Sequence, residues 1–132
     1  MILFFLHSGF MTTGLLLILS GFIIVRFMKS KRWWLKAHKG LETTGAVCIG
    51  LGLGVAFFMV ARNHHPHFSS PHTYLGAITI FLSILTVTLG YSIFRSKPWA
   101  PKLRAGHHWS GRTTLLLAGL TAFSGMVLAG IL

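Results

Sequence analysis

Four histidines each lie at the start of an apolar stretch that is long enough to cross a membrane. They are His7, His38, His72 and His107. A neutral imidazole binds iron and other transition metals through one ring nitrogen, and two imidazoles can occupy both axial positions of one haem iron. Four histidines on four membrane helices could therefore hold two haems.

Each histidine is followed, at steps of three and four residues, by a stripe that is rich in glycine and other small residues. Such steps keep side chains on one face of a helix. The stripes read Met11, Gly14, Ile18, Gly21 and Val25 after His7; Glu42, Gly45, Ile49, Gly52 and Ala56 after His38; Gly76, Thr79, Ser83, Thr86 and Gly90 after His72; and Gly111, Thr114, Ala118, Thr121 and Gly125 after His107. The first two stripes resemble each other, and so do the last two.

Small residues in these stripes would let a flat ring approach the helix backbone. On this interpretation Gly14, Gly45, Gly76 and Gly111 contact the haems. The alternative is close packing between helices, which membrane proteins achieve with the same residues and no cofactor. Close packing explains the small residues but leaves the four histidines unexplained.

The composition indicates a membrane protein. Hydrophobic residues make up 53% of the 132 residues, and Glu42 is the only acidic one. Four apolar runs, at 2–25, 41–61, 73–94 and 113–132, are each close to the ~20 residues that cross a ~30 Å hydrocarbon core. With the histidine-bearing turns added, we expect helices at about 2–25, 38–61, 72–94 and 107–131. The predicted fold is all-α: residues 1–132 form a single domain, an integral membrane antiparallel four-helix bundle with haem sites near both membrane faces.

The basic residues predict how the helices are oriented. All of the 12 lysines and arginines except Arg62 flank the first and third connections. Because cytoplasmic loops carry an excess of Lys and Arg, these connections should face the cytoplasm, and both termini should lie on the opposite side of the membrane. We expect this membrane to be a plasma membrane or an inner membrane. The net charge of +11 is thereby explained by the lipid bilayer, and no nucleic-acid partner is required.

This orientation pairs the histidines by depth. His7 and His72 lie at the outer level, and His38 and His107 lie at the inner level, so each pair can ligate one haem iron. Cys48 is the only cysteine, so the chain has no Cys-x-x-Cys-His attachment site and both haems should be b-type. His108 is a rival to His107, but its own helix face carries Arg112 and bulky residues where a ring would need room.

In these features the chain resembles the cytochrome b561 family, over nearly its whole length. The resemblance rests on His7 with Met11, Lys36 with His38 at a helix start, His72 with Gly76, and His107 with Gly111. It implies a di-haem oxidoreductase that moves electrons across a membrane, from a cytoplasmic-side or quinol donor to an outer-side acceptor, either a ferric species or a redox protein. Family members usually have six helices, so this chain looks like a minimal core.

The resemblance also implies a site for an ascorbate-like anionic donor beside the inner haem. Five basic residues lie in that region: Lys31, Arg32, Lys36, Lys102 and Arg104. They could equally be positive-inside anchors or partners of the haem propionates, and a membrane quinol is an equally good donor.

Three further features remain open. Arg62 could pair with a propionate of the outer haem. His64, His65 and His67 could bind a metal or an acceptor protein, or could simply be solvated. Glu42 could accept a proton coupled to electron arrival, or could form a salt bridge with a basic neighbour.

Two other functions fit parts of the sequence. The chain could be the cytochrome b subunit of a larger quinol-linked complex, or a haem-free scaffold or transporter-like bundle whose histidines pair by hydrogen bonding. Association with further copies of itself is also open.

Overall fold

The computed structural model of the protein describes residues 1–64 and 66–132, and in this part of the chain the regular structure is entirely helical. The helices are α1 (Ile2–Phe27), α2 (Trp34–Arg62), α3 (Pro71–Arg95) and α4 (Ala100–Leu128), with a short 3₁₀ helix, η1 (Lys97–Trp99), before α4. All four long helices are long and apolar enough to cross a membrane. The predicted class, an all-α membrane protein with four spanning helices, is confirmed.

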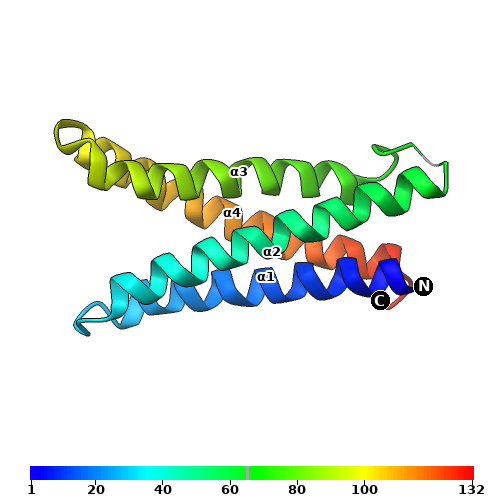
Figure 1. Cartoon of the computed structure of the whole chain (residues 1–132), viewed down its shortest axis with the longest axis horizontal. Coiled ribbons are helices and arrows are strands. Elements are labelled where there is room, and N and C mark those ends of the chain that lie inside the picture. The colour runs from blue at the N-terminus through cyan, green and yellow to red at the C-terminus, as the bar shows by residue number, and fades with distance from the viewer. Residues whose placement is uncertain (65) are drawn as a thin grey trace. The chain divides into compact units, whose positions relative to one another are not determined.

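The helices form two hairpins in which neighbouring helices run antiparallel (Figure 1). The first hairpin, Met1–Ser69, contains α1 and α2, and the second, Ser70–Leu132, contains α3 and α4.

The α1–α2 interface is built from glycines that let two backbones approach closely. A Cβ atom added to Gly14 would lie 3.0 Å from the carbonyl oxygen of Gly45, and one added to Gly45 would lie 3.1 Å from that of Gly14. Ile18 and Ile49 are buried beside these glycines. Because the closest atoms include backbone, a side chain at either glycine would push the helices apart.

The α3–α4 interface uses hydroxyl groups instead. Thr79 Oγ1 lies 3.1 Å from Thr121 Oγ1, and Thr86 Oγ1 lies 3.2 Å from Thr114 Oγ1. The buried Ser83 hydroxyl donates to the backbone carbonyl of Thr79. Each of these hydroxyls has a hydrogen-bond partner, as a group away from water requires.

Both interfaces are made of the stripes seen in the sequence. The buried residues of the four helices are Gly14, Ile18 and Gly21 in α1; Gly45, Ile49 and Gly52 in α2; Thr79, Ser83 and Thr86 in α3; and Thr114 and Ala118 in α4. Within each hairpin, a residue of one helix and the residue at the same place in the other helix's stripe make equivalent contacts. In the first hairpin the equivalent residues Gly14 and Gly45 face each other. In the second, Thr79 is equivalent to Thr114 and Thr121 to Thr86, so the Thr79–Thr121 contact is matched by Thr114–Thr86. The resemblance between stripes is thus an approximate two-fold symmetry inside each hairpin.

Two helices begin earlier than expected. α2 begins at Trp34 rather than 38, and α4 begins at Ala100 rather than 107, so His38 and His107 lie within helices rather than at their first turns. The prediction followed the apolar runs, which charged residues interrupt, but charged residues do not stop a helix. Pro101 is compatible with the first turn of α4 because a first-turn N–H has no intrahelical acceptor.

Candidate functional site

All four predicted ligand histidines place their rings against the neighbouring helix of their own hairpin. In each case Nδ1–H donates to a backbone carbonyl oxygen: His7 to Gly52 at 2.9 Å, His38 to Gly21 at 3.1 Å, His72 to Thr121 at 3.0 Å and His107 to Thr86 at 2.9 Å. A carbonyl oxygen can only accept a hydrogen bond, so the proton of each neutral ring is on Nδ1.

This tautomer fits the chemistry of an iron ligand. With the proton on Nδ1, the lone pair of the imidazole is on Nε2, the nitrogen that would bind iron. Metal-ligating histidines usually donate their other N–H to a carbonyl or carboxylate, which fixes the tautomer and the plane of the ring. The four side chains therefore suit haem ligation.

Glycines make room for two of these rings in the second hairpin. A Cβ atom added to Gly90 would lie 3.0 Å from Cε1 of His107, and one added to Gly125 would lie 2.9 Å from Cε1 of His72. A larger residue at either position would collide with the imidazole. These last glycines of the α3 and α4 stripes thus help to orient the histidines.

The two histidines of one hairpin lie at opposite ends of it. His38 contacts α1 at Gly21, which is about 21 Å along that helix from His7, at 1.5 Å rise per residue. The second hairpin has the same spacing, because His107 contacts α3 at Thr86, about 21 Å from His72. One iron cannot bind both histidines of a hairpin.

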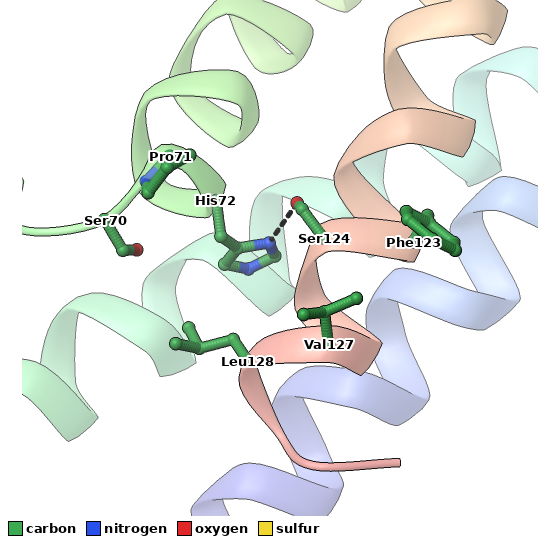
Figure 2. A pocket seen from close by; sticks show the side chains of 7 residues that line it. All are labelled: Ser70, Pro71, His72, Phe123, Ser124, Val127 and Leu128. Atoms are coloured by element: carbon green, nitrogen blue, oxygen red, sulfur yellow. Dashed lines mark hydrogen bonds between the residues drawn. The ribbon is translucent and has the colours of Figure 1, made fainter. Parts of the chain in front are cut away.

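A pocket of about 310 Å³ lies beside His72 within the second hairpin (Figure 2). It is lined by Ser70, Pro71, His72, Phe123, Ser124, Val127 and Leu128. Figure 2 shows the imidazole of His72 turned toward Ser124, whose Oγ lies 3.2 Å from Nδ1. Apolar side chains provide most of the rest of the wall, as a porphyrin ring would require.

The four glycines predicted to contact haem lie in the hairpin interfaces. Gly14 and Gly45 face each other, while a Cβ atom added to Gly76 would lie 3.8 Å from the methyl group of Thr121 and one added to Gly111 would lie 3.5 Å from that of Thr86. The structure thus gives these glycines the packing role that was the alternative interpretation. Contact with haem remains a prediction for all four.

The predicted donor residues lie at one end of each hairpin, the end that carries His38 in the first and His107 in the second. Lys31, Arg32 and Lys36 are exposed at the His38 end of the first hairpin, and Lys102 and Arg104 are exposed at the His107 end of the second. Lys102 also lies over the ring of Trp99, 5.0 Å from its centroid.

Other candidates lie at the surface. Arg62 is exposed at the last residue of α2, and His108 is exposed on α4, unlike the half-buried His107. His67 packs on the ring of Phe57 at 4.7 Å, while His65 lies outside the described residues. Within residues 1–64 and 66–132, no three His, Cys, Asp or Glu side chains are grouped so that they could hold a metal ion.

Sequence reasoning missed the carbonyl groups that orient the histidines. Each acceptor is the fourth residue of the stripe on the neighbouring helix: Gly21, Gly52, Thr86 and Thr121. The similarity of the two stripes in a hairpin could have predicted these acceptors. When two antiparallel helices with similar stripes pack together, the histidine at the start of one stripe lies opposite the far end of the other stripe.

The fold defines a class, the all-α integral membrane proteins, and the shared tautomer of the four histidines would suit b-type haem. The family described as eukaryotic cytochrome b561 matches residues 6–131, and the chain belongs to the cytochrome b561 family. It is therefore a transmembrane haem b electron-transfer protein.

A curated relative is the lysosomal membrane ascorbate-dependent ferrireductase of Bos taurus. The two are 28% identical over 137 residues, which cover 96% of this chain and 51% of the relative. The chain thus spans about half the length of the curated relative that it matches. No solved structure matches the chain.

Proposed function

We propose that the chain holds two haem b groups and carries electrons across the membrane between them. His7 and His72 ligate the outer haem, and His38 and His107 ligate the inner one. The observation that carries this proposal is the common orientation of the four imidazoles, each with Nδ1–H on a backbone carbonyl of its own hairpin.

The spacing within each hairpin supports the pairing. Because the histidines of one hairpin are about 21 Å apart along a helix, an iron with two histidine ligands must take one from each hairpin. If all four helices span the membrane, α1 and α3 begin on one side and α2 and α4 on the other, which matches His7 with His72 and His38 with His107.

Haem iron supplies the one-electron chemistry, and the protein supplies position and insulation. The carbonyls of Gly21, Gly52, Thr86 and Thr121 hold the imidazole planes, and the apolar helix surfaces keep water from the ligands. Two imidazole levels about 21 Å apart span most of a ~30 Å hydrocarbon core and leave a margin of about 4–5 Å at each face.

An anionic reductant fits the inner end best. Exposed lysines and arginines cluster at the His38 and His107 ends, and the bovine relative is named as ascorbate-dependent. We propose ascorbate, or a similar anion, as the donor and a ferric species as the acceptor, with Arg62 at the outer end.

A vesicle assay tests the proposed transfer. The purified protein is reconstituted into liposomes with ascorbate trapped inside, and reduction of an external, membrane-impermeant ferric chelate is followed. We expect reduction that depends on the protein and is lost in the His7→Ala and His38→Ala variants. Equal reduction by protein-free vesicles, or none by fully haem-loaded protein, would contradict the proposal.

A further inference from the structure

The two ends of the first hairpin are chemically different one helical turn after each histidine. Under the approximate two-fold symmetry, His38 corresponds to His7, Gly21 to Gly52 and Glu42 to Met11. Cγ and Cε of Met11 each lie 3.2 Å from where a Cβ of Gly52 would be, and Oε1 of Glu42 lies 2.6 Å from where a Cβ of Gly21 would be. A thioether therefore packs in one site where a carboxyl group packs in the other.

The carboxyl group lies beside the ligand histidine. Oε1 of Glu42 is 3.6 Å from Nδ1 of His38, and the Glu42 side chain is only 19% exposed. The same Nδ1–H donates to the carbonyl of Gly21, at 3.1 Å. Gly21 thus provides the acceptor for His38 and, because it has no side chain, the space for Glu42.

No second carboxyl side chain can reproduce this arrangement at the other histidines, since Glu42 is the only acidic residue of the sequence. At His72 the residue four positions later is Gly76, and the side chain beside Nδ1 is the neutral hydroxyl of Ser124 from the neighbouring helix. Among the four histidines, only His38 can therefore have a carboxyl side chain of this chain beside its Nδ1.

We propose that Glu42 is a positioning residue for His38 that lowers the reduction potential of the inner haem below that of the outer haem. This inference rests on the proposed function. An ionised carboxyl group 3.6 Å from Nδ1 stabilises positive charge on the imidazole and so makes Nε2 a stronger electron donor, and such neighbouring groups tune the metal through its ligand. A stronger donor stabilises ferric over ferrous iron, so electrons pass downhill from the inner haem to the outer one.

The test is a redox titration of the purified holoprotein, monitored by haem absorbance and by the low-spin g values in electron paramagnetic resonance. The redox transition and the g value that are lost in the His38→Ala variant identify the inner haem. In Glu42→Met, which gives the inner site the residue type of the outer site, we expect two haems per chain, a higher inner potential, a changed inner g value and an unchanged outer haem. Met11→Leu is the matched control and should leave both potentials where they are.

Two further variants keep the inference falsifiable. Glu42→Gln retains a hydrogen-bond acceptor of similar size and should shift the inner potential in the same direction but less, and it decides the question if Glu42→Met loses its inner haem. Gly21→Ala keeps Glu42 but displaces its carboxyl group, and it should raise the inner potential too.

The outcomes separate this inference from the proposed function. If the Glu42 variants bind two haems with unchanged potentials, or if only the outer haem shifts, the inference is wrong and the di-haem function stands. If the unaltered protein binds no haem, the proposed function is wrong and the inference falls with it.

Discussion

Each of the four histidines is oriented by a backbone carbonyl of the neighbouring helix. The carbonyls of Gly21, Gly52, Thr86 and Thr121 accept the four Nδ1–H bonds, and no substitution at these positions removes a carbonyl. The position of each imidazole therefore depends on how the two helices of its hairpin pack together. A substitution that shifts one helix also shifts the imidazole that is hydrogen-bonded to it.

His107 and His108 give a direct test at this scale. Only His107 has its ring in the hairpin interface, while His108 is exposed, with its ring centroid 6.2 Å from that of His107. We expect His107→Ala to reduce bound haem from two to one per chain and His108→Ala to leave it at two. Haem per chain, measured by the pyridine haemochromogen method, checks this prediction, and the reverse pattern would assign the ligand to His108.

At the scale of the helices, close approach of backbones positions the ligands. Glycine is required at Gly14 because a Cβ atom there would lie 2.6 Å from Cγ1 of Ile49 and 3.0 Å from the carbonyl oxygen of Gly45. The side chain of Ile49 can rotate, but the Gly45 backbone can move only with its helix.

We therefore expect Gly14→Ala to destabilise the first hairpin by about 1–3 kcal/mol through overpacking. Gly50→Ala is the matched control, since a Cβ atom there meets no atom of the described residues within 4 Å. It should be neutral, or stabilise α2 by up to ~1 kcal/mol through helix propensity. Unfolding in sodium dodecyl sulfate, followed by tryptophan fluorescence, compares the two, and equal midpoints would show that Gly14 has no packing role.

The number of helices and the faces that they bury were predictable from the sequence. Hydropathy and the stripes predicted four helices, and every buried residue of these helices proved to belong to a stripe. The starts of α2 and α4 were placed too late, because Lys36 and Arg104 are polar but compatible with a helix. The sequence could not decide whether a stripe faces a neighbouring helix or a porphyrin, because small residues suit both. In the structure Gly14 lies against Gly45 of the neighbouring helix.

At the scale of the molecule, topology decides which haem is the inner one. Lys and Arg residues flank the α1–α2 and α3–α4 connections, and by the positive-inside rule we expect both connections to face the cytoplasm. The proposed direction of electron flow, from an anionic cytoplasmic donor to an outer ferric acceptor, depends on this orientation.

Labelling of single cysteines tests the orientation. In a Cys48→Ser background, Ser30→Cys marks the α1–α2 connection and Ser69→Cys marks the α2–α3 connection, and both serines are exposed. An impermeant maleimide added to intact cells should label Ser69→Cys and should label Ser30→Cys only after the membrane is permeabilised. Labelling of Ser30→Cys but not Ser69→Cys in intact cells would contradict the predicted orientation and indicate the opposite one.

The most direct test of the central claim is to identify which haem is lost from each of the four single variants His7→Ala, His38→Ala, His72→Ala and His107→Ala, by pyridine haemochromogen count and redox titration. The unaltered chain should bind two b haems. His7→Ala and His72→Ala should lose one and the same component, and His38→Ala and His107→Ala should lose the other. Loss of the same component from His7→Ala and His38→Ala, or an unchanged count in all four variants, would contradict the ligand assignment.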